Sequence, residues 1–328
     1  MTKNTMIKKT LTIIISLSII ILFVSCLKTG KPIKGSILLV KQSYIAYITH
    51  DDNVFFIDLN GNKRTLQGSE GVVKILGTEQ VLILLHHDGL VDVRHSDTGE
   101  PLTELECLGY LNEDEEGTKN GTIADYVDLC KYFESHSDIQ DIIVADPNCY
   151  VAKIDGKWYG DLIESNPQLE SVSLYKIIGS VGNPAEYVLD EEGRIIRLPD
   201  ATSAEFLIPD ASVTYVDASC YEKPYFVGTD GLVYTMGPRI IPEFHDAVAV
   251  SSGLYMTAVV DKNGNAQIRS NSTSEEYKEA LEWKNLVYLA VNWDSLVGID
   301  SKGNVKFTSS IEEKFDVNYK ELPKAKVK

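Results

Sequence analysis

The stretch FVGTDGLVYTMG, residues 226–237, runs from an apolar strand through an Asp-Gly pair into a second apolar strand. Asp-Gly is a strong hairpin signal, because the tight turn needs a positive φ that glycine adopts without a Cβ penalty. Similar stretches recur, among them VVDKNGNAQI (259–268) and LVGIDSKGNVKF (296–307). The seven predicted turns pivot at Asn53, Gly89, Gly156, Gly193, Gly231, Gly264 and Gly303. We expect Asn53 to stand in for glycine, since asparagine tolerates positive φ.

The turns recur at a nearly constant interval, with steps of 36, 67, 37, 38, 33 and 39 residues between pivots. A fixed period of 20 to 50 residues indicates a repeat architecture in which each unit buries its apolar faces on its neighbours. The strand before each turn, such as Val81 to Leu85, is apolar on both faces, which predicts that it lies between two other layers. A further apolar run precedes it, a third strand follows, and usually a more polar fourth, such as Leu102 to Cys107.

The repeat resembles that of the RCC1-like propellers in residues 226–237, 248–268 and 286–307. That repeat has an apolar strand, a small residue, a loop, an apolar strand, Asp-Gly, and a strand ending near Trp-Gly, which is Met236-Gly237 here. The resemblance implies an all-β, seven-bladed β-propeller with four-stranded blades of about 37 residues spanning residues 36–322. Its short repeats are most similar to compact secreted members that inhibit β-lactamases. The segment DVRHSDTGEPL also resembles a WD40 or quinoprotein blade end, so the subfamily stays open.

The N-terminus has the pattern of a secretory signal peptide, predicted over residues 1–25. Three lysines precede an apolar run from Leu11 to Val24. As a helix this run would be about 21 Å long, short of the roughly 30 Å hydrocarbon core. The tetrapeptide ending at Cys26, Phe-Val-Ser-Cys, resembles a bacterial lipobox, which implies that Cys26 is acylated and that residues 26–35 form a lipid-anchored tether. An uncleaved N-terminal anchor is the alternative; both place the propeller on the extracytoplasmic side of a membrane.

The charge of the chain argues against nucleic-acid partners. The formal net charge is −17, and removing the three lysines of the leader leaves 28 basic against 48 acidic residues, or −20. Such a domain is repelled by nucleic acid and by anionic head groups. Residues 323–328 form a basic tail too short to reverse this, and we expect it to fray.

The long step holds an insertion over residues 108–137, between the second and third repeats. Its first half, LNEDEEGTKNGT, reads as a loop, and Thr122 with Asp125 has a capping-box pattern. We expect one short helix after it, with Ile123, Tyr126, Val127, Cys130 and Phe133 on one face. Both a decorative surface insertion and a functional docking element fit this pattern.

No constellation of residues predicts catalysis, a metal or a cofactor. Four cysteines after Cys26 permit disulfides, and four buried thiols fit equally well: Cys107, Cys130, Cys149 and Cys220. None of the six histidines lies in a catalytic or metal-ligating motif. Asp58 and the two asparagines around Gly61 faintly resemble a calcium loop but lack the downstream glutamate, so a hairpin explains them better.

One column of residues stands out as a candidate binding site. Nine or ten positions before four of the pivots, in the predicted loop between the first and second strands, stand Tyr44, Tyr221, Tyr255 and Trp293. These loops leave one face of a propeller, and large aromatics dominate interface hot spots. Packing between blades is the simpler explanation for such residues.

The sequence thus predicts a membrane-anchored, non-catalytic propeller that binds an extracytoplasmic protein partner through these aromatics. A glycan-binding module would use the same rings for sugar stacking. An exported enzyme would need a polar cluster near the axis, for which the scattered Lys74, Lys176 and Asp217 are the main candidates.

Overall fold

The computed structural model describes most of the chain after residue 35. The described residues are 36–104, 107, 126–146, 149–180, 183–198, 212–221, 223–235, 239–271, 275, 277–293 and 295–327. The predicted signal peptide, Cys26 and the tether lie outside them.

The described chain is all-β, built of consecutive small antiparallel sheets in which neighbouring strands follow one another in sequence. Two sheets have four strands: β1–β4 (Leu38–Val40, Tyr44–Ile48, Val54–Asp58, Lys63–Thr65) and β14–β17 (Tyr215–Cys220, Pro224–Gly228, Val233–Thr235, Arg239–Ile240). Five have three described strands: β5–β7 (Val72–Gly77, Val81–His86, Val91–His95), β8–β10 (Asp141–Asp146, Cys149–Ile154, Lys157–Tyr159), β11–β13 (Leu174–Ser180, Asn183–Asp190, Ile195–Arg197), β18–β20 (Ala247–Ser252, Met256–Asp261, Ala266–Ser270) and β21–β23 (Leu286–Asn292, Ser295–Asp300, Val305–Phe307).

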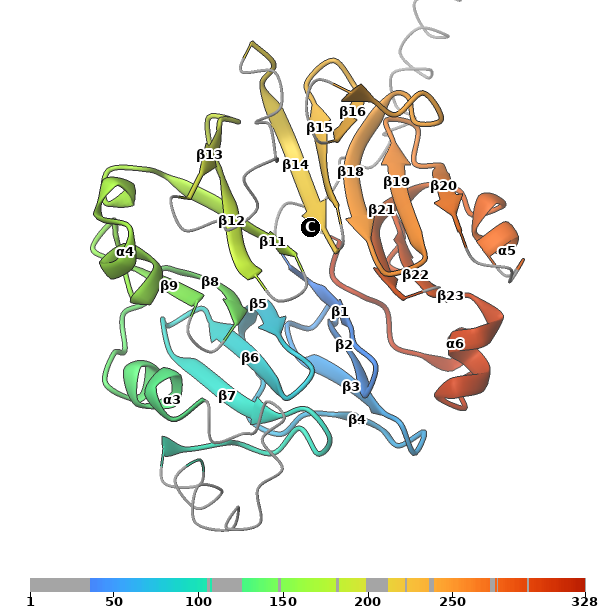
Figure 1. The fold of residues 1–328 in the computed structure, drawn as a ribbon. Coiled ribbons are helices and arrows are strands. Elements are labelled where there is room, and N and C mark those ends of the chain that lie inside the picture. Colours follow the sequence, from blue (N-terminus) through green and yellow to red (C-terminus); the bar gives the residue numbers. More distant parts are fainter. Residues whose placement is uncertain are drawn as a thin grey trace, which may run out of the picture.

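The sheets follow one another around a common centre (Figure 1). The first strand of each sheet packs against the first strand of the next, and β21 packs against β1. The neighbour contacts therefore return to the sheet at which they began.

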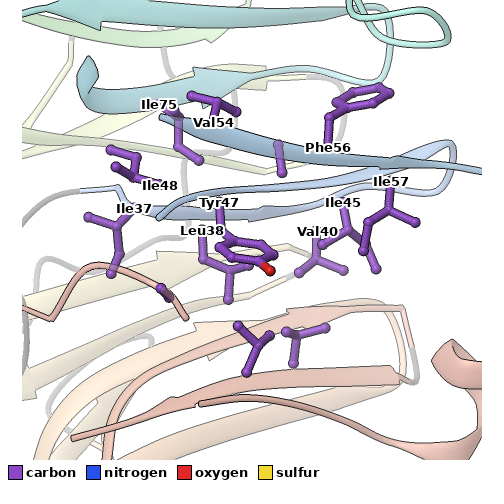
Figure 2. Close-up of a cluster of buried hydrophobic side chains, with 14 of the residues drawn as sticks. Ile37, Leu38, Val40, Ile45, Tyr47, Ile48, Val54, Phe56, Ile57 and Ile75 are labelled. Carbon is purple, nitrogen blue, oxygen red and sulfur yellow. The ribbon is translucent and has the colours of Figure 1, made fainter. Parts of the chain in front are cut away.

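The second strand of each sheet is the most buried one, as its two-sided apolar pattern predicts. Every residue of β2, β19 and β22 is buried. Around β2, a cluster of branched and aromatic side chains fills the space between the first sheet and its neighbours (Figure 2). Burial of such faces supplies most of the driving force for stacking one sheet on the next.

The hairpin turns confirm six of the seven predicted pivots, because all six glycines have φ between 76° and 88°. The exception is Asn53: the positive φ falls on Asp52, at 60°. The turn has the same length as the others, because the NH of Thr49 donates to the carbonyl oxygen of Asn53 as that of Gly228 donates to Leu232. Asp52 therefore takes the glycine position, and the prediction that Asn53 replaces the glycine was wrong.

The pivots also connect neighbouring sheets. The carbonyl oxygen of Gly264 accepts a 2.9 Å hydrogen bond from the NH of Leu286, at the start of the next sheet. A Cβ on Gly264 would lie only 2.9 Å from that nitrogen. Equivalent bonds join Ile139 to Gly89, Tyr215 to Gly193 and Ala247 to Gly231. Glycine is therefore required here both for its positive φ and for the close approach of the next strand.

Short helices replace several of the predicted fourth strands. The α-helices of the described residues are α3 (Val127–Glu134), α4 (Asp161–Ser165), α5 (Tyr277–Leu281) and α6 (Ser309–Lys314), with 3₁₀ turns η2 (Pro167–Leu169) and η3 (Tyr319–Glu321). Helices α4, α5 and α6 follow the third strand of their sheets and pack on it. The expectation of four strands in every blade and a single helix was wrong, because an edge needs only an apolar cover, which Leu162 and Ile163 provide on α4.

The helix predicted in the insertion is α3. It begins after Tyr126 and buries Leu129, Cys130 and Phe133. The predicted cap residues and Ile123 lie outside the described residues, and no side chain caps the helix at Tyr126.

The basic tail is not frayed. The NH of Lys326 donates to the carbonyl oxygen of Ile48 and the NH of His50 donates to that of Lys324, at 2.8 and 3.0 Å. Ala325 is buried, and the Tyr47 hydroxyl donates to the carbonyl oxygen of Pro323 at 2.9 Å. The tail thus extends the first sheet beside β2, and its basic composition does not predict this role.

Among the described residues, no helix is long and apolar enough to span a membrane.

Candidate partner-binding face

Tyr44 does not belong to a binding surface. It is the first residue of β2 and is fully buried, stacked on Phe56 with ring centroids 5.6 Å apart. Its hydroxyl donates to the carbonyl oxygens of Thr78 and Val81, and burial raises its pKa well above the ordinary value. The loop before β2 is short, so the position that falls in a loop elsewhere falls in a strand here. Its assignment to the partner site was wrong.

Tyr255 and Trp293 do meet at the surface. They lie in the β18–β19 and β21–β22 loops, and their rings pack edge to face with centroids 6.5 Å apart. Tyr255 is 42% exposed and Trp293 is 39% exposed. Within the described part of the chain, Tyr159 is the one other large aromatic side chain that is exposed. Two exposed aromatics in contact form a local apolar surface.

The backbone beneath this pair is fixed in an uncommon conformation. Trp293 has a φ of 53°, in the left-handed region that a bulky residue rarely adopts. Its carbonyl oxygen accepts a 3.1 Å hydrogen bond from the NH of Tyr255. A Cβ on Gly253 would lie 2.8 Å from the nitrogen of Trp293, so glycine is needed for the two loops to approach. Strain of this kind is found most often at functional sites.

Tyr221 joins the same surface through a shallow pocket of about 90 Å³ between the fifth and sixth sheets. Tyr221 and Tyr225 line it from one side, and Tyr255 and Arg269 from the other, with Lys223 and Asn271 at its edges. We call Tyr221, Tyr255 and Trp293 the aromatic face. Three of the four predicted aromatics are thus brought together.

Hydrogen bonds hold the two sides of the pocket in register. The Ser219 and Ser252 hydroxyl oxygens are 2.9 Å apart, and the NH of Ser252 donates to Ser219 Oγ at 3.0 Å. These bonds link β14 to β18, and Ser252 itself lines the pocket. The surface is therefore preorganised, which lowers the entropic cost of binding.

The lysines and the aspartate predicted near the axis link sheets to one another and do not gather into one cluster. Lys74 Nζ donates to Asp141 Oδ1 at 2.7 Å, and Lys176 Nζ donates to Asp217 Oδ1 at 2.9 Å. Asp217 Oδ2 also accepts from the NH of Val250 at 2.8 Å, which ties β14 to β18. Each pair joins successive first strands, so we assign these residues to packing between sheets.

The calcium-like turn is satisfied by its own hydrogen bonds. Asp58 Oδ1 accepts from the NH groups of Asn60 and Asn62, and Asp261 repeats this pattern with Asn263 and Asn265. Partial burial alone would raise the pKa of Asp58, but these bonds and those from the Asn62 side chain hold it below its ordinary value. The hairpin interpretation therefore explains both turns. No group of three potential metal ligands occurs among the described residues.

The comparisons with known proteins identify the fold and nothing narrower. No protein-family model and no curated protein matches the chain. The CRINKLY WD40 ectodomain of the receptor kinase ACR4 from Arabidopsis thaliana aligns over 84% of this chain and 95% of its own, with a TM-score of 0.51 and 9% identity. WD40 domains are β-propellers, so the fold is that of a propeller.

Two further solved structures are less similar. The computationally designed protein Ika8 covers 85% of this chain and 83% of its own, with 14% identity and a TM-score of 0.42. Prp20p of Saccharomyces cerevisiae aligns over 79% of this chain and 66% of its own, with 11% identity and a TM-score of 0.35. The RCC1-like assignment stays a prediction.

Proposed function

We propose that this chain is a closed, RCC1-like seven-bladed propeller that is anchored extracytoplasmically by Cys26, binds a protein partner on the aromatic face and does no chemistry. The observation that carries the proposal is the exposed Tyr255–Trp293 pair, whose loops are fixed by a backbone hydrogen bond and by Gly253. Rigid, amphipathic aromatics with one ring face accessible are the residues on which protein interfaces most depend.

The size of the pocket favours a protein partner over a small molecule. Ligand and cofactor pockets commonly measure about 300 to 1,000 Å³, whereas this one measures about 90 Å³. That volume suits one side chain of a larger partner, and interface hot spots are typically side chains that fill such pockets. A sugar ring stacked on Trp293 is the competing use of the same surface.

Capture experiments with matched variants test the partner site. The full chain in detergent, immobilised as bait, should retain a defined envelope or host protein. Tyr255→Ala with Trp293→Ala should reduce the retained amount at least about tenfold, because truncating a hot-spot aromatic costs about 2 kcal/mol or more. Tyr159→Ala removes an equally exposed tyrosine from another sheet and should change nothing. Equal retention by the double variant would contradict the proposal.

The anchor has its own test. Cys26→Ala should abolish labelling by an alkyne analogue of palmitate, because the thioether of a lipoprotein forms on that sulfur. Stable anchoring needs two lipid signals where a single chain is marginal. Labelling of the variant as strong as that of the parent would refute the assignment of Cys26 as the acylated residue, and absence of labelling in the parent would favour an uncleaved apolar anchor.

A further inference from the structure

The edges of the pocket in the aromatic face carry positive charge, although the chain as a whole is strongly acidic. Lys223 and Arg269 both line it, from the fifth and the sixth sheet. Lys223 makes no ion pair with any described residue. Arg269 forms an exposed ion pair with Glu243 at 3.9 Å, which is too long for a hydrogen bond. Both cations therefore keep donors for a ligand, in a chain whose net charge is −17.

The other lining groups fit the same kind of ligand. Asn271 adds an amide at the edge, and Tyr221, Tyr225 and Tyr255 supply rings and hydroxyl groups. Guanidinium and ammonium donors form charge-assisted hydrogen bonds with carboxylates, which are about twice as strong as neutral ones. The aromatic walls suit the methylene groups of the side chain that carries the carboxylate.

We infer that the partner inserts a carboxylate side chain, aspartate or glutamate, between Lys223 and Arg269, while a neighbouring apolar residue of the partner packs on Tyr255 and Trp293. This inference rests on the proposed partner site and adds the chemistry of what it recognises. The net negative charge of the chain repels acidic segments in general. The positive charge at this pocket attracts an acidic segment locally. The charge pair thereby makes the site specific, and the aromatic pair provides the contact area.

Peptide arrays test this inference without a known partner. The probe is the full chain, fluorescently labelled, on decapeptides with acetylated and amidated ends. Each peptide carries a central Glu, Gln or Lys beside a Leu or Phe. We expect at least tenfold stronger binding to the Glu peptides than to their Gln counterparts. Lys223→Ala with Arg269→Ala should abolish this preference, whereas Lys262→Ala, on the opposite rim, should keep it.

The outcomes separate the inference from the proposed function. Equal binding to Glu and Gln peptides that is lost in the Tyr255→Ala, Trp293→Ala variant would overturn the carboxylate pocket and leave the aromatic site standing. Preference for Glu that survives the Lys223→Ala, Arg269→Ala change would also overturn it. A parallel array of neutral and uronic-acid glycans tests for a glycan ligand. Binding to glycans without binding to peptides would contradict both proposals. Binding to neither array would also contradict both.

Discussion

The NH of Ala325 donates a 2.8 Å hydrogen bond to the carbonyl oxygen of Gly303, which joins the end of the chain to the turn of the last sheet. The residues on either side of Ala325 pair with the end of β2 in the first sheet. Residues 324–326 thus contact the first and the last repeat at once. They occupy the place that the start of the next sheet takes at Gly264 and Gly231.

Removal of the tail tests this role. Deleting residues 323–328 should lower the free energy of unfolding by about 3 kcal/mol or more, because four hydrogen bonds are lost and each contributes about 1 kcal/mol. Lys326→Met removes only the 2.6 Å ion pair with Asp52, which is partly exposed, and should cost less than about 1 kcal/mol. Urea denaturation measures both; an unaffected truncation would mean that the tail is dispensable.

Substitutions at two glycines distinguish the cost of backbone strain from the cost of close contact with the next sheet. Gly264 and Gly156 have nearly equal φ of 76° and 77°. A Cβ on Gly264 would meet the next sheet, whereas a Cβ on Gly156 would meet nothing within 4 Å. Gly156→Ala should cost about 1 to 2 kcal/mol from the left-handed conformation alone. Gly264→Ala should cost about 1 to 3 kcal/mol more through overpacking. Equal losses in thermal unfolding would show that the sheets do not meet at this turn.

The Asp261 turn predicts a sensitivity to acid. Partial burial alone would raise the pKa of Asp261, but hydrogen bonds from Asn265 and Asn263 outweigh it and lower the pKa. A lowered pKa stabilises the fold above the unfolded pKa of about 3.9, and this contribution disappears as pH falls through the lower folded pKa. Asn265→Ala should therefore cost about 1 kcal/mol at pH 7 and progressively less below about pH 4. Asn271→Ala is the control and should show no such pH dependence.

Cys107 and Cys130 are positioned to form a disulfide. Their sulfur atoms lie 3.5 Å apart and both residues are buried where α3 packs. Oxidised glutathione should accept the two electrons and two protons of these thiols, leaving the protein two hydrogens lighter and releasing two reduced glutathiones. Peptide mapping by mass spectrometry should find this link alone. Cys220 should stay a thiol, because burial raises its pKa to about 12. A different pairing, or none, would contradict the prediction.

The sequence predicts the repeat well because its signals are local. Asp-Gly and Asn-Gly turns, such as that at Gly264, depend on neighbouring residues alone, and so do strands apolar on both faces. The helices α4, α5 and α6 were missed because each is little more than one turn long, and helices this short depend on tertiary packing.

The site was harder to predict, since it depends on contacts between sheets. Counting positions back from each turn found Tyr255 and Trp293 but misplaced Tyr44, because the count ignores loop length. Lys223 and Arg269 lie on different sheets, and no local pattern connects them. The proximity of Cys107 to Cys130 likewise appears only when α3 packs on the second sheet.

Hydrogen–deuterium exchange with the captured partner tests the central claim most directly. Backbone amides at residues 251–257 and 289–293 should exchange more slowly in the complex, and those in the Asp-Gly turns around Gly89 and Gly231 should be unchanged. Protection at those acidic turns, with the aromatic loops exchanging as in the isolated protein, would place the partner on the opposite rim and contradict the account.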